Sequence, residues 1–340
     1  MRFSLASLLS NDIGIDLGTA NTLVYVKGQN IVVDEPSIVA LDRQTRKPLA
    51  IGAGAKEMMG RENPDIEVVR PLRDGVIADF DVTEEMLRFF IRRVQKNKLL
   101  VRPRIVICVP SGVTPVEMRA VRESAERAGA REVYLIKEPM AAAIGIGLPV
   151  EKPVGSMVID IGGGTTEIAV IALSGIVTWR SIKTAGDEMN EAISQFLKRK
   201  HNLLVGERSA EQIKCAVGSA GPLEGGEIQH PCRGLDLVSS IPKTIIVDSS
   251  EIREALREAV DSIIDSVRQT LEQTPPELAA DILDRGIIMT GGGALLRGLD
   301  RLLVEETSLP VIVAEEPLTC VVRGTGKVLE NIGAYQKVLM

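Results

Sequence analysis

Two segments of this sequence share an aspartate followed by a short turn of small residues. Residues 16–26, DLGTANTLVYV, align without a gap on residues 160–170, DIGGGTTEIAV. Each copy predicts an apolar strand, a tight turn and a second strand, so the sequence contains a repeated β-hairpin. Backbone N–H groups at such a turn can point into one small concave space, because glycine has no Cβ to block a phosphate. Two matched hairpins therefore indicate a clamp for a polyphosphate.

The aspartate in each copy favours a cation at the same site. A carboxylate beside phosphate would be repelled unless a hard cation lies between them, and Mg²⁺ bridges oxygen ligands, water and phosphates. We therefore expect Asp16 and Asp160 to face one Mg²⁺, largely through water. The expected phosphate-binding residues are Gly18, Thr19, Ala20 and Asn21 in the first turn and Gly162, Gly163, Gly164 and Thr165 in the second. Two ordinary structural hairpins are the alternative interpretation.

A third glycine-rich segment, GIIMTGGGALLRGL at residues 286–299, predicts a strand, three glycines and a helix. Gly291, Gly292 and Gly293 would let a flat ring or a sugar pass close to the backbone, and the helix N-terminus would favour an anion. A plain strand-to-helix turn is the alternative. A Rossmann fingerprint does not fit, because Leu296 stands where its third glycine belongs.

The segment KEPMAAAIG at residues 137–145 places a carboxylate at the start of a helix. Pro139 is typical of a first helical turn and leaves Glu138 near the positive end of the helix. Glu138 could orient water for attack on a γ-phosphate, or could simply cap the helix. The small residues that follow suit a helix packed closely on another element at a hinge.

Composition excludes several other classes of protein. The chain has 340 residues, 40 Lys and Arg against 46 Asp and Glu, and a net charge of −6, so we expect no general nucleic-acid partner. Its two histidines and four widely spaced cysteines argue against histidine-based chemistry, structural zinc and a disulfide framework. The sequence shows neither an apolar run long enough to span a membrane nor a signal peptide, so a cytoplasmic protein is expected.

Short apolar segments alternate with capped helical segments, which is typical of an α/β protein. Expected helices cover about 116–128 and 251–273, the second starting after Ser249 and Ser250. Expected strands cover 13–16, 105–109, 157–161, 168–173, 244–247, 286–290 and 310–313. The stretches 33–73 and 183–242 look like smaller inserts.

These motifs, in this order, resemble the actin, Hsp70 and sugar-kinase superfamily, and within it the MreB family of bacterial actins. The resemblance covers nearly the whole chain and also includes residues 71–80, PLRDGVIADF, and residues 109–112, VPSG. It implies an α/β, actin-like (ribonuclease H-like) two-lobed ATPase fold with ATP in the interlobe cleft. The implied subdomains are residues 1–32, 74–155 and 318–340 (lobe I, large), 33–73 (lobe I, small), 156–182 and 243–317 (lobe II, large) and 183–242 (lobe II, small).

The resemblance also implies roles for individual residues. It assigns activation of water to Glu138 with help from Thr165, and the Mg²⁺ sphere to Asp16 and Asp160. Nucleoside contacts fall on Gly291 to Gly293 and on Glu211 and Lys214, which are expected one helical turn apart after a cap at Ser209. Gly186 and Asp187 would lie beside the nucleotide. Lys137 and Asn190 depart from acidic residues common in the family.

The family resemblance further implies head-to-tail, paired protofilaments that maintain rod shape by organising cell-wall synthesis. The implied partners are other copies of the chain, the lipid surface of the inner membrane and membrane proteins of the cell-elongation machinery. Leu99, Leu100 and Val101, an apolar run among basic residues, are the expected membrane contact. A weaker candidate anchor is the N-terminal segment of about ten residues.

Two other functions share these motifs. A monomeric Hsp70-like binding module would use the same hairpins, although little sequence remains here for a peptide-binding domain. A sugar or acid kinase would need a substrate pocket with a catalytic aspartate, for which the sequence offers no convincing candidate. Product analysis separates the second from an ATPase, because a kinase leaves a phosphorylated substrate.

Overall fold

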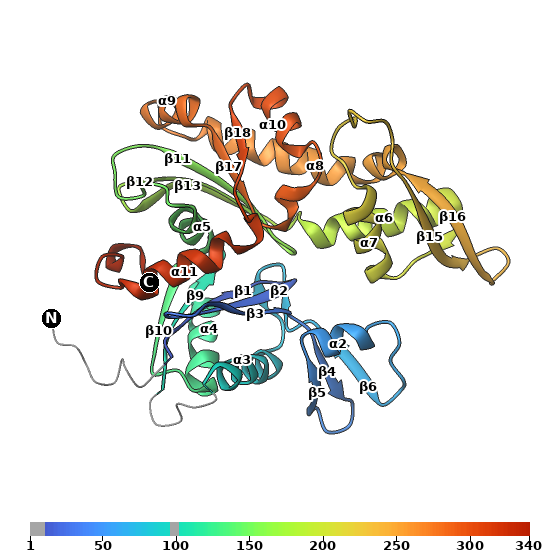
Figure 1. Ribbon diagram of the computed structural model, residues 1–340, viewed down its shortest axis with the longest axis horizontal. Coiled ribbons are helices and arrows are strands. Elements are labelled where there is room, and N and C mark those ends of the chain that lie inside the picture. Colours follow the sequence, from blue (N-terminus) through green and yellow to red (C-terminus); the bar gives the residue numbers. More distant parts are fainter. Residues whose placement is uncertain (1–10, 96–101) are drawn as a thin grey trace.

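The computed structural model describes residues 11–95 and 102–340 (Figure 1). Two five-stranded mixed sheets form its framework, one at the centre of each lobe. The lobe I sheet has the order β10-β9-β1-β2-β3 and the lobe II sheet the order β18-β17-β11-β12-β13. The expected two-lobed α/β architecture is confirmed.

The strands of lobe I are β1 (Ile13–Leu17), β2 (Asn21–Val26), β3 (Asn30–Pro36), β9 (Arg104–Val109) and β10 (Glu132–Lys137). Those of lobe II are β11 (Ser156–Ile161), β12 (Thr166–Ala172), β13 (Gly175–Ile182), β17 (Ile287–Thr290) and β18 (Val311–Val313). In each sheet the first hairpin strand pairs antiparallel with its partner and parallel with a strand on its other side. The repeated hairpin therefore belongs to a repeated sheet.

The register of the two hairpins is also the same. Leu17 pairs with Thr22 in the first, and Ile161 pairs with Thr166 in the second. Both turns therefore contain four residues, 18–21 and 162–165, as the gapless alignment predicts.

Helices cover both faces of the sheets. In lobe I, α3 (Phe80–Val94) and α4 (Pro115–Ala128) pack on the outer face, where α4 begins at a Thr114 and Glu117 capping box and ends at Gly129. In lobe II, α8 (Ser249–Glu272) and α10 (Leu299–Thr307) form the outer layer, and α9 (Pro276–Arg285) precedes β17. Short 3-10 helices cover η1 (Gly292–Leu295), η2 (Pro317–Thr319) and η3 (Gln336–Val338).

Two helices lie between the sheets, as Figure 1 shows: α5 (Glu138–Ile146) and α11 (Cys320–Glu330). They cross at glycines. A Cβ on Gly145 would lie 1.9 Å from Cys320 O, and one on Gly324 would lie 1.8 Å from Ala141 O. The small residues after Glu138 therefore do what the sequence suggested, because they let this helix pack closely on another at the junction of the lobes.

Each lobe carries a smaller sheet. In lobe I this sheet has the order β5-β4-β6 and consists of β5 (Pro48–Ile51), β4 (Val39–Asp42) and β6 (Ile66–Val69), with α2 (Ala53–Met58) beside them. A separate two-stranded sheet pairs β7 (Leu72–Arg73) with β8 (Val76–Ile77). In lobe II the smaller sheet has the order β14-β15-β16 and consists of β14 (Leu203–Leu204), β15 (Gln229–Asp236) and β16 (Pro242–Asp248). Helices α6 (Gly186–His201) and α7 (Glu207–Val217) accompany it. Two expected subdomain boundaries fall inside strands, residue 33 in β3 and residue 243 in β16. The four-part division itself stays a prediction.

Two expected helix starts are wrong. Helix α8 begins at Ser249 rather than after Ser250, because the Asp248 side chain accepts the N–H groups of Ser250 and Glu251. Ser209 caps nothing, since α7 already begins at Glu207. Among the described residues, no helix combines the length and apolar character needed to cross a bilayer.

Candidate nucleotide site

The two glycine-rich turns meet face to face between the lobes. A Cβ on Gly163 would lie 2.6 Å from the Ala20 Cβ, and one on Gly164 would lie 2.7 Å from Thr19 Oγ1. A Cβ on Gly164 would also lie 3.0 Å from the Asp74 backbone nitrogen. Side chains at these two positions would hold the turns apart, so the glycines permit backbone groups of both lobes to converge on one small space.

Asp16 and Asp160 occupy equivalent places at the ends of β1 and β11. Each carboxylate accepts a hydrogen bond from the neighbouring parallel strand: Cys108 Sγ lies 3.1 Å from Asp16 Oδ1, and Thr290 Oγ1 lies 2.7 Å from Asp160 Oδ1. Burial raises the pKa of Asp16 to about 7, although the Cys108 hydrogen bond opposes the shift and Asp160 adds to it. Burial also raises the pKa of Asp160. Both carboxyls therefore gain from a nearby cation.

This donor set fits Mg²⁺ held mainly by water and phosphate. The site has two hard carboxylates, and the charge of Asp160 contributes to the raised pKa of Asp16. Within residues 11–95 and 102–340, no group of three or more His, Cys, Asp and Glu side chains forms a protein cage. Mg²⁺ commonly takes one or two carboxylates and completes its shell with water and substrate oxygens. Asp16 and Asp160 are suited to that arrangement.

Glu138 is the first residue of α5 and only 9% exposed. Burial raises its pKa well above the ordinary value, and the charges of Glu167, Asp16 and Asp160 add to the effect. The ammonium of the neighbouring Lys137 lies 5.4 Å from the centre of the Trp179 ring. Because burial and three nearby carboxylates disfavour its charged form, Glu138 loses its proton reluctantly.

Gly186 and Asp187 lie against the second turn, which ends at Thr165. Gly186 N donates to Gly162 O at 3.1 Å and Asp187 N donates to Gly163 O at 2.7 Å. Thr165 is buried, and a Cβ on Gly75 would lie 3.0 Å from its Cγ2. The start of α6 and the second hairpin therefore form one wall.

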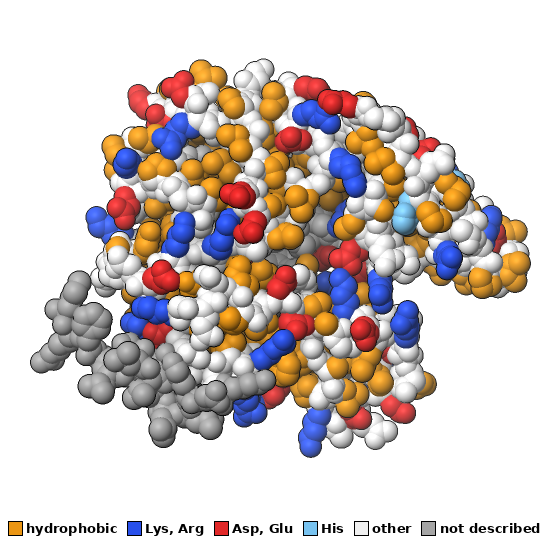
Figure 2. All heavy atoms as spheres, in the orientation of Figure 1, with side chains coloured by type: hydrophobic (Ala, Val, Ile, Leu, Met, Phe, Trp, Pro, Cys, Tyr) orange, Lys and Arg blue, Asp and Glu red, His pale blue; other side chains and the backbone are white. Residues whose placement is uncertain are grey.

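Glu211 and Lys214, the two nucleoside contacts expected on α7, have different partners in the structure. Lys214 Nζ donates to Gly186 O at 2.7 Å and so lies at the wall. Glu211 instead pairs with Lys56 of lobe I, with 3.0 Å between Glu211 Oε2 and Lys56 Nζ. Arg70, which directly follows β6, and Glu207, the first residue of α7, make a second ion pair between the lobes. Figure 2 shows a notch here with charged side chains on its walls.

The three glycines at 291–293 pack more tightly than the sequence suggested. A Cβ on Gly291 would lie 2.3 Å from Ile161 O, and one on Gly293 would lie 2.1 Å from Ile161 Cγ2. Packing on β11 thus explains two of them. The expected helix directly after them is wrong, because Gly292 and Gly293 belong to the 3-10 turn η1 and α10 begins only at Leu299. Their nucleoside role stays a prediction.

A family model described as "MreB/Mbl protein" matches residues 10–337. The cell shape-determining protein MreB of Escherichia coli (strain K12) is 55% identical in an alignment 335 residues long, which covers 96% of this chain and 96% of that one. This chain belongs to the MreB/Mbl family.

Solved structures agree with the family assignment. MreB5 of Spiroplasma citri bound to AMPPNP superposes with a TM-score of 0.91 at 38% identity, covering 96% of this chain and 97% of that one. A MamK double helical filament gives a TM-score of 0.79 at 22% identity, covering 94% of this chain and 99% of that one. The second match supports the actin-like fold alone.

Three residues that the sequence interpretation missed stand beside the site: Glu167, Cys108 and Thr290. Thr290 immediately precedes the three glycines, and Cys108 holds the equivalent place in lobe I, one residue before β9 ends at Val109. Glu167 could have been found from the hairpin alignment, because it is an acidic residue where the first copy has Leu23.

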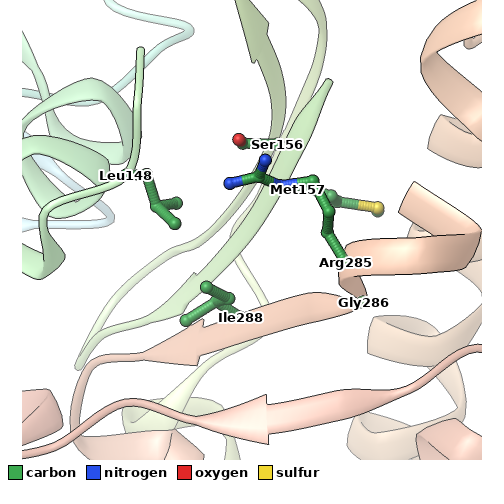
Figure 3. A pocket seen from close by; sticks show the side chains of 6 residues that line it. All are labelled: Leu148, Ser156, Met157, Arg285, Gly286 and Ile288. Atoms are coloured by element: carbon green, nitrogen blue, oxygen red, sulfur yellow. The ribbon is translucent and has the colours of Figure 1, made fainter. Parts of the chain in front are cut away.

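A separate cavity of about 270 Å³ lies at the opposite ends of β11 and β17. Figure 3 shows the Arg285 side chain extending toward Ser156 and Leu148, with Ile288 below them. None of the expected nucleotide residues lines it. The expected membrane residues Leu99, Leu100 and Val101 and the N-terminal segment lie outside the described residues.

Proposed function

We propose that this chain binds ATP and Mg²⁺ between its lobes, hydrolyses the ATP, and assembles with other copies of itself into filaments that help to determine cell shape. The observation that carries the proposal is the convergence of two equivalent turns with Asp16 and Asp160 at equivalent positions. The name of the E. coli relative supports the cellular role, and the AMPPNP bound to S. citri MreB5 supports the nucleotide.

In this proposal the backbone N–H groups of residues 18–21 and 162–165 hold the phosphates, and Asp16 and Asp160 hold the water shell of Mg²⁺. Bound Mg²⁺ would neutralise charge on the phosphates during hydrolysis. Glu138, buried at the start of α5, would orient the attacking water with help from Thr165. Lys214 would support the nucleoside side through the Gly186 carbonyl.

The remaining parts of the proposal concern the cell. We place the protein in the cytoplasm, peripheral to the inner face of the membrane, where filaments would meet lipid and proteins of the elongation machinery. Filaments multiply a weak contact by presenting many copies on one face, so attachment would follow assembly.

High-speed pelleting tests the central claim. Purified protein is centrifuged with Mg-ATP and with ATP plus EDTA, and the pellets are imaged by negative stain. We expect ordered filaments and released phosphate only with Mg²⁺. A protein that binds ATP and stays monomeric would favour a nucleotide-switched binding module, and a phosphorylated sugar or acid product would favour a kinase.

A further inference from the structure

Glu167 is a fully buried carboxylate on the inner face of the lobe II hairpin, with 0% of its surface exposed. Successive side chains of a strand point to opposite faces. Ile168 and Val170 of β12 pack in the outer core of lobe II, whereas Ala169 and Ile171 pack in the layer that contains α5 and α11. Glu167 alternates with the inner set and therefore faces α5.

The first hairpin shows that this place does not require a charge. Leu23 pairs with Asp16 as Glu167 pairs with Asp160, and Leu23 packs in the same inner layer. An apolar residue thus satisfies the packing in one copy of the repeat. Burying a carboxylate in the other copy costs free energy, so a property other than packing accounts for Glu167.

The carboxylate of Glu167 joins the two lobes. Ser111 N donates to Glu167 Oε2 at 2.9 Å, and Ser181 Oγ donates to Glu167 Oε1. Ser111 follows β9 in lobe I, whereas Ser181 belongs to β13 in lobe II. The same loop packs on β13 through Gly112, whose Cβ position lies 3.5 Å from the Trp179 ring.

The loop at Ser111 and the residue Glu138 follow the ends of two neighbouring parallel strands of lobe I. Val109 at the end of β9 pairs with Lys137 at the end of β10, in parallel register. Glu138 follows Lys137, and Ser111 follows Val109 by two residues. A bond that holds Ser111 to lobe II therefore also restrains the start of α5. The effect of Glu167 on the pKa of Glu138 agrees with their closeness.

We propose that Glu167 is a positioning residue for ATP hydrolysis, which holds the Ser111 loop and the start of α5 against the lobe II hairpin so that Glu138 reaches the bound phosphates. The inference rests on the proposed ATPase function. Its role is to accept hydrogen bonds from both lobes. Nucleotide binding, which depends on the turns and the metal carboxylates, does not require it.

Three substitutions test this role. Glu167→Leu installs the residue of the first hairpin and removes both hydrogen bonds, so single-turnover phosphate release should fall about 10- to 100-fold, as expected for a misplaced catalytic group. Glu167→Gln keeps an amide oxygen for Ser111 and should restore most of the rate. Ser181→Ala removes only the lobe II donor and should slow release by a smaller factor. Nucleotide Kd should change by less than about threefold in all three.

The matched control is Thr178→Val, which alters another buried hydroxyl of β13, bonded to Gln273 O. Melting temperatures are recorded for every variant, and Glu167→Gln and Ser181→Ala keep the test usable if Glu167→Leu does not fold. Wild-type phosphate release in Glu167→Leu overturns the inference, as does a Glu167→Gln rate as low as that of the leucine variant. A wild-type protein that binds ATP without releasing phosphate overturns the ATPase proposal itself.

Discussion

Lys56 Nζ lies 3.0 Å from Glu211 Oε2, and this ion pair joins α2 of lobe I to α7 of lobe II. Arg70 and Glu207 form a second pair beside it. Both pairs join the lobes on the side of the site where Lys214 contacts Gly186, so we expect them to oppose the release of a bound nucleotide. An exposed ion pair stabilises the contact that it makes by only about 0 to 1 kcal/mol, so we expect each pair to hold the lobes together weakly.

The double substitution Lys56→Ala with Arg70→Ala should therefore raise the nucleotide dissociation rate by a few-fold, about 2- to 10-fold, with a larger effect at low salt. Stopped-flow displacement of a fluorescent ATP analogue measures it. Arg46→Ala is the matched control, since Arg46 pairs with Glu67 and Asp79 within lobe I. Equal dissociation rates in wild type and double variant would show that the two ion pairs do not slow nucleotide release.

Glu138→Ala should keep ATP binding and slow hydrolysis by about 10²-fold or more, because a positioned group that handles the proton of the attacking water is removed. Equilibrium binding and single-turnover phosphate release separate the two effects. Glu117→Ala, which changes an exposed cap of α4, serves as the control. Unchanged turnover would mean that another group positions the water.

The rate of hydrolysis should depend on pH through Glu138. Burial and the charges of Glu167, Asp16 and Asp160 raise its pKa, so the proton is retained at pH values where an ordinary glutamate is ionised. Only the ionised form can accept a proton from water. Turnover should therefore be low in acid and rise as pH passes a midpoint above the ordinary glutamate value.

Single-turnover rates across pH, at protein concentrations below those that pellet, measure this dependence. Glu138→Gln should give a low and nearly flat profile. A wild-type midpoint at the ordinary value for glutamate would contradict the assignment of Glu138.

Thr290→Val should weaken Mg²⁺-dependent nucleotide binding about 10-fold, because the hydroxyl that orients Asp160 is lost while the side-chain shape is kept. Titration with Mg²⁺ at fixed ATP measures the change. Cys108→Val should act in the same direction at Asp16. Thr270→Val is the control, since that buried hydroxyl bonds to Ser266 O within α8. Identical Mg²⁺ midpoints in Thr290→Val and wild type would argue against the metal site.

Gly145→Ala should destabilise the protein by about 1 to 3 kcal/mol, since its Cβ would lie 1.9 Å from Cys320 O and force α5 away from α11. Thermal unfolding measures the loss. Gly333→Ala is the control, because its Cβ would meet no atom within 4 Å. Equal melting temperatures for both variants would refute the close crossing.

Sequence reasoning succeeded where local chemistry repeats. The gapless alignment of residues 16–26 with 160–170 predicted two matched hairpins, and their equal register confirms it. It was less accurate where a backbone can begin a helix at several neighbouring residues. Helix α8 starts at Ser249, before the expected position, because the side chain of Asp248 reaches its free N–H groups. The Ser209 side chain does not cap α7, which already begins at Glu207.

The sequence by itself determined the fold class, the paired turns, and the family, because these follow from residue types at fixed spacing along the chain. Only the tertiary structure decided what depends on long-range approach. It placed Lys56 against Glu211, set Gly293 against Ile161, and joined Ser111 to Glu167 across the lobes. Such contacts link residues far apart in sequence, and their geometry exists only once the packed sheets and helices bring them together.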